Sequence, residues 1–420
     1  MHSIGNYDNN FIMNTLLQIN SVVNSGSTGR IAEEIGQTAI AAGWKSYIAY
    51  GRNERPSESE LIKIGNDWDI KMHGFQTRLF DRHGLGSRSA TKELIEKINE
   101  ISPDIIQLHN IHGYYINIVI LINYLQKTNI PIVWTFHDCW PITGHCSHFS
   151  FVGCEKWKKK CYECPQKTSY PASWLVDRSE ENFHLKKELF TSLTNLTLVP
   201  VSNWLSEILK ESYLKDYPIK LIRNGINAGV FKPSTSRAFR RKHGLENKFI
   251  LLGVASVWSP RKGLKDFIEL SKHLNSEYQI VLIGLTREQI EQLPDNIMGI
   301  ERTESVEELA IMYSEADIVL NLSYEETFGL TTVEGFACGT PGIVYNATAS
   351  PELIDESTGL VVEPGDINGL IDAIIQIEQN GKQSYSETCL NRAHRLYKKE
   401  DRYKEYIDLY EQLIRKISNS

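Results

Sequence analysis

Residues 324–341 read YEETFGLTTVEGFACGTP and follow an apolar run from Asp317 to Ser323. The run predicts a buried strand and the helical pattern starts near Leu330, so Gly329 lies in a strand-to-helix turn. The free amides of a first helical turn and the helix dipole attract anions, and a glycine lets the backbone approach one closely. A phosphate-binding turn in an α/β domain is therefore expected here.

Two glutamates accompany this turn. Glu326 lies in the turn, and Glu334 lies one turn into the expected helix, so both can border one cleft. Carboxylates would repel a phosphate, which suggests that they bind hydroxyl groups instead, and sugar hydroxyls are the obvious candidates. The alternative is a capped helix with two solvated acids. The Phe328-Gly329 that opens the helix and the Gly339-Thr340-Pro341 that closes it weigh against that alternative.

The pattern resembles the glutamate-seven-residues-glutamate signature of the retaining glycosyltransferases of family 4. The resemblance extends to Ser323 and to Ala337-Cys338-Gly339-Thr340-Pro341. It implies the GT-B fold, in which two Rossmann-like domains border a deep cleft, and a nucleotide-sugar donor. It also implies that Glu326 holds hydroxyls of the donor sugar and Glu334 the nucleotide ribose. Further donor contacts are expected from Phe328, Gly329, Leu330 and Thr331.

Composition is ordinary for a soluble globular protein of two or three domains, with 420 residues, 41% apolar and 23% charged. No apolar run approaches the roughly 18 to 20 residues of a membrane span, and no signal-peptide pattern is present, so a cytoplasmic location is expected. Neither half of the chain is basic enough to indicate nucleic-acid binding. A lysine cluster, whose alternative is simple solvation, is a candidate for peripheral contact with anionic lipid at the inner membrane face. Its members are Lys156, Lys158, Lys159 and Lys160.

Strand and helix patterns alternate after residues 1–12, which are polar and expected to form a disordered extension. A first, acceptor-binding domain is expected over residues 13–223, with a parallel sheet covered on both faces and ligands beyond the strands' carboxyl ends. Its first strand leads into the glycine-rich turn Ser25-Gly26-Ser27-Thr28-Gly29-Arg30. The family resemblance implies that this loop closes over the donor diphosphate and the acceptor, with Gly29 and Arg30 as contacts.

Three histidines fall at or just after expected strand ends. The segment Trp134-Thr135-Phe136-His137-Asp138 resembles the family's fourth strand, whose histidine points at the reacting sugar, and this implies a catalytic role for His137. His109 and His112 either shape the acceptor side or are structural. Asp67-Trp68-Asp69 has the aspartate spacing that holds a metal in the other large glycosyltransferase fold. Without partner ligands it is interpreted as a surface turn.

An insertion over residues 139–177 interrupts the alternation and holds five of the seven cysteines. Disulfides are not expected in a reducing compartment, whereas four thiolates can hold a structural zinc ion that orders such a loop. The alternative is four reduced cysteines in an aromatic-rich loop. The segment from His137 to Pro165 also resembles a bacterial surface-polysaccharide branch of family 4, which implies capsular or exopolysaccharide synthesis. The predicted zinc ligands are Cys146, Cys154, Cys161 and Cys164.

A short strand is expected over residues 219–222. The segment Arg223-Asn224-Gly225-Ile226-Asn227 that follows it resembles the interdomain linker of the family, so a second, donor-binding domain is expected over residues 224–399. Lys262-Gly263 matches the family's Lys-Gly, but the family's arginine falls on Val257, so Arg261 is the candidate for the second positive charge. Gly284 ends a further expected strand and is a predicted donor contact. Residues 400–420 are expected to form a helix that returns to the first domain.

Together these features predict a hexosyltransferase that moves a sugar, with retention, from a UDP- or GDP-sugar to a glycan or a polyprenyl-diphosphate-linked saccharide. Positive charge at Lys262 and Arg261 and the amides near Gly329 would stabilise the departing diphosphate in place of a metal, so no catalytic cofactor is expected. Two alternatives stay open. One is a nucleotide-sugar epimerase or phosphorylase of the same fold, and the other is a non-catalytic, zinc-stabilised binding subunit of a polysaccharide assembly complex, which the departure at Val257 would fit.

Overall fold

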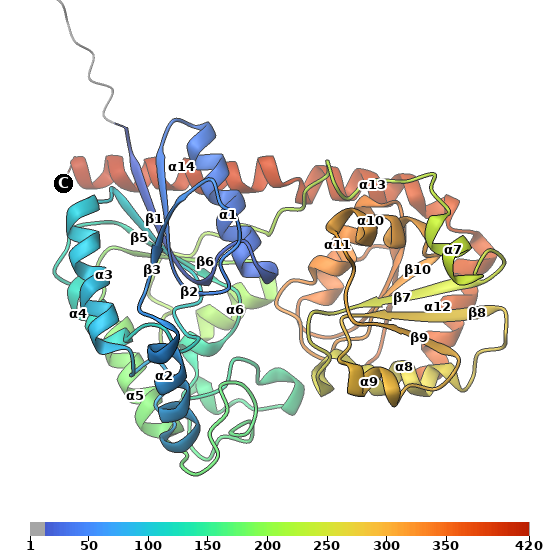
Figure 1. Ribbon diagram of the computed structural model, residues 1–420, viewed down its shortest axis with the longest axis horizontal. Helices are drawn as coiled ribbons and strands as arrows, with labels where there is room; N and C mark the ends of the chain where they lie inside the picture. Colours follow the sequence, from blue (N-terminus) through green and yellow to red (C-terminus); the bar gives the residue numbers. More distant parts are fainter. Residues whose placement is uncertain (1–12, 420) are drawn as a thin grey trace, which may run out of the picture.

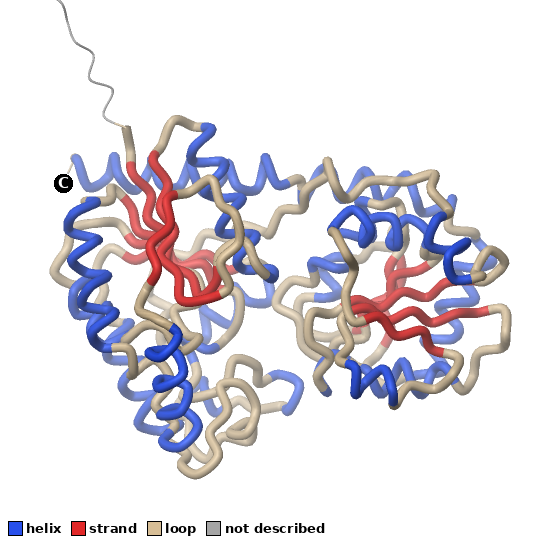
Figure 2. The backbone as a smooth tube through the Cα atoms, viewed as in Figure 1, coloured by secondary structure: helices blue, strands red, loops and turns tan. Residues whose placement is uncertain are grey.

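The computed structural model describes residues 13–419 and contains two six-stranded sheets, one in each half of the chain (Figure 1; Figure 2). All of the paired strands in both sheets run parallel. Helices surround each sheet, and the two domains lie next to each other along the long axis of the molecule (Figure 1). The two Rossmann-like domains predicted from the alternating pattern are therefore confirmed. The expected extension over residues 1–12 lies outside the described residues.

The first sheet has the strand order β3-β2-β1-β4-β5-β6. Strands β4, β5 and β6 are buried along their whole length, which explains why they read as apolar runs rather than as alternating patterns. The elements of this half are β1 Thr15–Val22, α1 Gly26–Ala41, β2 Lys45–Arg52, β3 Glu60–Lys63, α2 Asp67–Phe80, α3 Arg88–Ile101, β4 Ile105–Leu108, α4 Ile118–Leu125, β5 Ile132–Phe136, α5 Ser179–Phe190, β6 Leu196–Pro200 and α6 Asn203–Glu211. Within the cysteine-rich insertion the 3₁₀ turns are η1 Trp140–Ile142, η2 Ser150–Val152 and η3 Lys156–Lys158.

The second sheet has the order β12-β11-β10-β7-β8-β9, with β10 and β7 at its centre. Its elements are α7 Ala238–His243, β7 Phe249–Val254, η4 Pro260–Lys262, α8 Leu264–Ser271, β8 Tyr278–Ile283, α9 Arg287–Glu291, β9 Ile297–Ile300, α10 Val306–Glu315, β10 Ile318–Asn321, α11 Leu330–Ala337, β11 Gly342–Tyr345, η5 Ser350–Leu353, β12 Gly359–Val362 and α12 Ile367–Asn380.

Two further helices, α13 Gln383–Tyr397 and α14 Lys399–Ser418, end the described chain. Helix α13 contacts α11 in the second domain, whereas α14 packs on α1 of the first domain, as the red helix along the top of Figure 1 shows. Three tyrosines of α14, Tyr403, Tyr406 and Tyr410, are buried in one cluster with residues of α1 and of the first sheet. The returning C-terminal helix is therefore confirmed.

Within residues 13–419 the chain crosses between the domains twice, and the two crossings lie side by side. The amide of Ile226 donates to the carbonyl of Tyr397 at 2.7 Å, and the amide of Lys399 donates to the carbonyl of Ile226 at 3.1 Å. This parallel bridge joins Ile226 to Lys398, the extended residue between α13 and α14.

Two sequence-based expectations are wrong in detail. Asp67-Trp68-Asp69 is not a surface turn but the first turn of α2, because Asn66 caps that helix and the Asp69 carboxylate accepts the Asn66 amide at 2.9 Å. The strand expected over residues 219–222 is a single bridge from Leu198 to Ile219. None of the helices within residues 13–419 is long and apolar enough to cross a membrane.

Candidate functional site

The turn after β10 has the predicted strand-turn-helix geometry. Gly329 occupies the N-cap of α11 with φ +95°, a conformation that residues with a Cβ rarely adopt, and a Cβ there would lie 2.9 Å from Leu353. No side chain caps this helix terminus, so its first-turn amides keep the partial positive charge that attracts an anion. Phe328 is buried against the ring of Tyr397, which fixes the turn from behind.

Lys262 and Glu326 form an ion pair beside this turn. Lys262 ends the short turn η4 that follows β7, and its ammonium group donates to the Glu326 carboxylate. Glu326 also accepts the hydroxyl of Ser323 at 3.0 Å, and its amide donates to Thr348 at 2.8 Å. The strand ends of β7 and β10 thus bring a fixed cation and a fixed carboxylate together.

Burial and the neighbouring charges act in opposite directions on the pKa of each member of this pair. Burial alone would raise the pKa of Glu326, but the positive charges of Lys262 and Arg261 outweigh it and hold the pKa below its usual range. For Lys262, burial lowers the pKa, and attraction to Glu326 opposes that shift. A half-buried ammonium next to a helix N-terminus is suited to hold a phosphate, while the Glu326 carboxylate is suited to accept hydroxyl groups.

Arg261 points at the backbone of the turn. Its guanidinium donates to the carbonyl of Glu325 at 2.7 Å, and its own carbonyl accepts the amide of Tyr324 at 2.8 Å. Val257, at the position of the absent family arginine, is 69% exposed. Arg261 therefore supplies positive charge at the turn. Contact between Arg261 and a diphosphate stays a prediction.

Gly284 follows β8 with φ +95°, and a Cβ there would overlap the carbonyl of Ala255. Glycine is therefore required by the packing of the loops that follow β7 and β8, and a role in donor binding stays a prediction. On the other domain, Gly29 lies in the first turn of α1 and packs against Val22, which allows the helix to start close to the end of β1.

Glu334 faces the first domain across the cleft. Its carboxylate lies 3.5 Å from the guanidinium of Arg30 on α1 and accepts the hydroxyl of Tyr313 at 2.9 Å. Burial is the main cause that raises the pKa of Glu334, and Arg30 works against it. The two carboxylates therefore differ, since Glu326 is paired with a cation of its own domain and Glu334 with one across the cleft.

A cavity of about 170 Å³ lies between the domains next to Glu334. It is lined in part by Ser27, Arg30, Glu34, Asn227, Glu307, Leu330 and Glu334.

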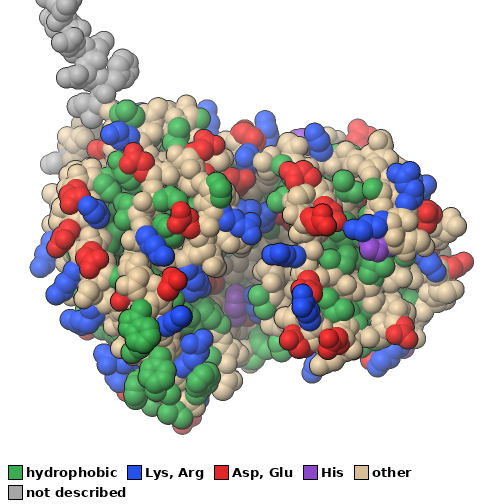
Figure 3. All heavy atoms as spheres, viewed as in Figure 1, with side chains coloured by type: hydrophobic (Ala, Val, Ile, Leu, Met, Phe, Trp, Pro, Cys, Tyr) green, Lys and Arg blue, Asp and Glu red, His purple; other side chains and the backbone are tan. Residues whose placement is uncertain are grey.

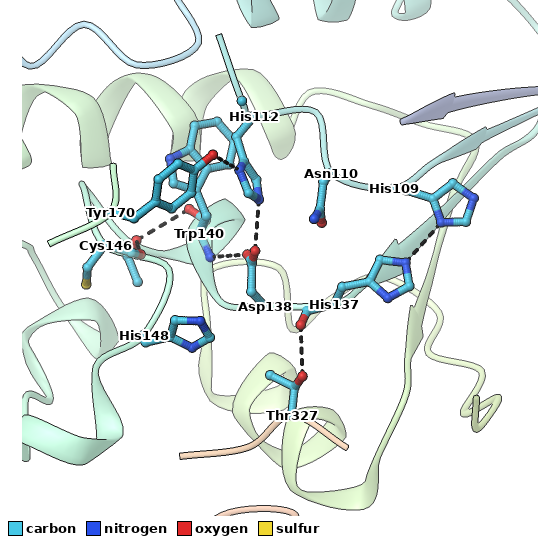
Figure 4. A network of polar contacts seen from close by, with 12 residues as sticks. His109, Asn110, His112, His137, Asp138, Trp140, Cys146, His148, Tyr170 and Thr327 are labelled. Atoms are coloured by element: carbon cyan, nitrogen blue, oxygen red, sulfur yellow. Dashed lines mark hydrogen bonds and ion pairs between the residues drawn. The ribbon is translucent and has the colours of Figure 1, made fainter. Parts of the chain in front are cut away.

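His137 lies at the end of β5 on the first-domain side of the cleft, where Figure 4 shows it next to His109 and Thr327. The two imidazoles meet at 3.0 Å, and the other nitrogen of His109 lies 3.0 Å from the side-chain oxygen of Gln18. The amide nitrogen of Gln18 donates to the carbonyl of Ala32, so the Gln18 side-chain oxygen accepts from Nε2 of His109. Nδ1 of His109 is therefore an acceptor, and Nε2 of His137 donates to it. Burial lowers the pKa of His137 to about 4. His137 is thus neutral, with Nδ1 as an acceptor.

A second polar group, shown in Figure 4, lies beside His137. Nε2 of His112 lies 2.8 Å from the carboxylate of Asp138, and its Nδ1 lies 3.0 Å from the hydroxyl of Tyr170. Burial would raise the pKa of Asp138, but His112 outweighs it and lowers the pKa to about 2. The backbone amide of Trp140 also donates to Asp138 at 2.9 Å. His112, which the sequence left undecided, thus orients Asp138 at the mouth of the first domain.

Glu325 joins the two domains, and the sequence analysis missed it. Its carboxylate is fully buried and accepts the amides of Phe149 at 3.2 Å and Phe151 at 3.1 Å, both in the cysteine-rich insertion. The imidazole of His148 also lies 3.3 Å from it. Thr327, two residues after Glu325 in the same turn, donates its hydroxyl to the carbonyl of His137 at 2.9 Å. No sequence signal indicates the role of Glu325, because its partners lie about 175 positions away in the chain.

The four predicted zinc ligands line one small cavity with His145. The amide of Gly144 donates to the sulfur of Cys161 at 3.2 Å. A hydrogen bond from Cys146 is the main cause that lowers the pKa of Cys164 to about 7. Nevertheless, within residues 13–419 no group of three or more His, Cys, Asp or Glu side chains is arranged to hold a metal ion. The thiols are gathered but do not form a ready coordination shell in this conformation, and zinc stays a prediction.

Comparison with known proteins places this site in context. The family model "Glycosyltransferase Family 4" matches residues 28–230, and "Glycosyl transferases group 1" matches residues 235–398. The chain is 22% identical to the putative colanic acid biosynthesis glycosyl transferase WcaC of Escherichia coli, over 95% of this chain and 100% of that protein.

Solved structures share the fold. Sucrose-phosphate synthase from Thermosynechococcus elongatus superposes with a TM-score of 0.72 at 18% identity, over 95% of this chain and 99% of that one. HepE from Anabaena, solved in complex with UDP-glucose, superposes with a TM-score of 0.66 at 16% identity, over 97% and 100% of the two chains. The GT-B arrangement of two Rossmann-like domains is therefore shown.

Proposed function

Because the chain belongs to the glycosyltransferases of family 4, we propose that it moves a sugar from a nucleoside diphosphate to an acceptor hydroxyl with retention of configuration. The donor is a UDP- or GDP-sugar. The observation that carries this proposal is the Lys262–Glu326 pair beside the open N-terminus of α11, facing His137 across the cleft. A phosphate cradle next to a hydroxyl-binding carboxylate is the arrangement that a sugar diphosphate requires.

Each residue has a separate role in the proposed reaction. The amides of the turn after Gly329 and the ammonium of Lys262 bind the diphosphate and stabilise the charge that develops as the glycosidic bond breaks. Glu326 holds hydroxyls of the donor sugar, and Glu334 holds the ribose. Neutral His137 accepts a hydrogen bond from the sugar through Nδ1. The departing phosphate oxygen takes the proton of the acceptor hydroxyl on the same face, which preserves the anomeric configuration.

The acceptor is a glycan or a lipid-linked saccharide of bacterial polysaccharide synthesis. The full-length similarity to a protein named for colanic acid biosynthesis supports this part of the proposal. The proposed location is the cytoplasm, with peripheral contact at the inner face of the cell membrane. Zinc in the cysteine cluster is proposed as a structural element, with no part in the transfer.

A thermal-shift screen of nucleotide sugars tests the donor, because the base and the sugar are reported together. A UDP- or GDP-sugar should raise the melting temperature, and the Lys262→Ala variant should lose that shift. Incubation of donor with enzyme alone separates the alternatives. Conversion of the donor into an isomer would indicate an epimerase, and binding without turnover on any saccharide acceptor would indicate a binding subunit. Transfer that continues in EDTA would support diphosphate stabilisation by the protein's own cations.

A further inference from the structure

The first domain carries an exposed apolar surface on α2 and on the loop of residues 174–176. Trp68 is 68% exposed, Phe75 53%, Trp174 60% and Leu175 68%. Figure 3 shows hydrophobic side chains gathered at the lower end of this domain, with Lys and Arg side chains around them. A patch of exposed aromatic residues is typical of an interaction surface, because large apolar side chains in water do not stabilise the folded state.

The local structure holds these side chains outward. In α2 the inward positions are His73, Gly74 and Thr77, which are buried, so the large apolar residues Trp68, Met72 and Phe75 occupy the outer face. The loop is fixed to the end of this helix. The amide of Trp174 donates to the carbonyl of Arg78 at 2.7 Å, and the Arg78 guanidinium lies 5.8 Å from the centre of the Trp174 ring.

Charge around this surface is positive, although the whole chain carries −7. Lys71 and Arg82 are exposed, and within the described residues neither takes part in an ion pair with a carboxylate. The two acids of α2 are engaged at its start, since Asp67 lies 3.6 Å from Lys63 and the Asp69 carboxylate accepts the amide of the capping residue Asn66. Two copies meeting through this face would bring cations against cations. An anionic bilayer surface matches both the exposed tryptophans and the charge.

The lysine cluster predicted from sequence is a weaker candidate for the same contact. Lys156 donates to the carbonyls of Tyr162 and Glu163. Lys158 lies 2.9 Å from Glu155 and also from Glu211, and Lys160 lies 2.6 Å from Glu180.

A chain of contacts leads from the apolar surface to the cleft. Arg78, which touches Trp174, lies 5.9 Å from the ring centre of Tyr114, and the rings of Tyr114 and Tyr170 lie 6.0 Å apart. The hydroxyl of Tyr170 reaches His112, the partner of Asp138. We propose that α2 and the loop of residues 174–176 dock on an anionic lipid bilayer and so present the acceptor side of the cleft to a lipid-linked saccharide. The acceptor part of this inference rests on the proposed function, whereas the docking does not.

Vesicle flotation without donor or acceptor tests the docking. The full chain should bind vesicles of phosphatidylglycerol and phosphatidylethanolamine at least about tenfold more tightly than vesicles of phosphatidylcholine. The variant Trp68→Ser/Phe75→Ser/Trp174→Ser should lose at least about tenfold in partitioning. Its matched control is Val361→Ser/Ile375→Ser, which replaces exposed apolar residues of the second domain and should bind as the unaltered chain does.

The charge component is tested separately. Lys71→Glu/Arg82→Glu should weaken binding to the anionic vesicles at least about tenfold, whereas Lys265→Glu/Arg302→Glu, at exposed sites of the second domain, should not. Melting temperatures confirm that each variant is folded. Equal binding by all variants would overturn the proposal. The proposal would also be overturned if the unaltered chain did not bind vesicles but formed a dimer, and the triple variant were monomeric. In that case the apolar face would bind a second copy of the chain. Loss of vesicle binding with unchanged donor binding would separate this inference from the proposed function.

Discussion

The buried carboxylate of Glu325 gives a direct way to measure how the two domains are held together. In Glu325→Gln one side-chain oxygen remains, while an NH₂ group replaces the other, so only one of the amides of Phe149 and Phe151 keeps an acceptor. A hydrogen bond to a charged group contributes roughly 1.5–3 kcal/mol. The arrangement of the domains described here should therefore lose about 2 kcal/mol, which is about 30-fold in its equilibrium population.

The assay compares three quantities. The kcat/KM of sugar transfer should fall by up to about 30-fold, because the proposed mechanism requires His137 and Glu326 to face each other. The radius of gyration from small-angle scattering should increase. The nucleotide affinity should change much less, because the Lys262 turn lies in the second domain. The matched control is Glu363→Gln, whose exposed carboxylate accepts only Asn346 of its own domain among the described contacts. Unchanged kcat/KM and an unchanged scattering profile in Glu325→Gln would refute this account of the interface.

Three other predictions concern separate parts of the molecule. Lys262→Ala and Glu326→Ala should each reduce transfer at least about 100-fold with melting temperatures near that of the parent, and near-normal turnover in both would remove this pair from the chemistry. His73 accepts two backbone amides through Nε2, and burial lowers its pKa to about 4, so stability should fall as the pH drops from about 6.5 towards 4. The difference in melting temperature between pH 7 and pH 5 should shrink in His73→Gln, and an equal difference would argue against this histidine as the cause. Elemental analysis of untagged protein grown with zinc should find about one zinc per chain, and Cys161→Ser/Cys164→Ser should release it. Protein without zinc would show that the four thiols are ordinary loop residues.

The fold could largely be predicted from the sequence, because the central strands are buried apolar runs. In addition, turns after these strands have glycines where the backbone adopts a positive φ, such as Gly284 and Gly329. The Gly329 turn and the helix from Leu330 follow from local pattern alone. Short elements with little periodicity were missed, such as β11 with four residues directly after Pro341 and α9 with five. Helix α2 was missed because its outer face is apolar and its inner face polar, which inverts the usual signal.

The site was only partly readable for a different reason. Glu326 and Lys262 lie in segments that follow strands, and the resemblance of these segments to motifs of family 4 indicated them. Contacts across the cleft depend on how the two domains are arranged, and no local sequence pattern indicates them. Examples are the contact of Arg30 with Glu334 and the contact of Glu325 with the cysteine-rich insertion.

The adjacent crossings at Ile226 and Lys398 have a mechanical consequence. Both connections between the domains pass through one point and are hydrogen-bonded to each other, so any rotation of one domain on the other must pivot there. A small change of backbone dihedral angles at these few residues would be enough to open or close the cleft, and the atoms farthest from the pivot would move most. The sheets and the α1–α14 cluster could keep their own core contacts during such a rotation, so each would move as a rigid body. The pivot at Ile226 and Lys398 and the Glu325 contact thus join the same two domains at separate points, and the candidate site lies in the cleft between these domains.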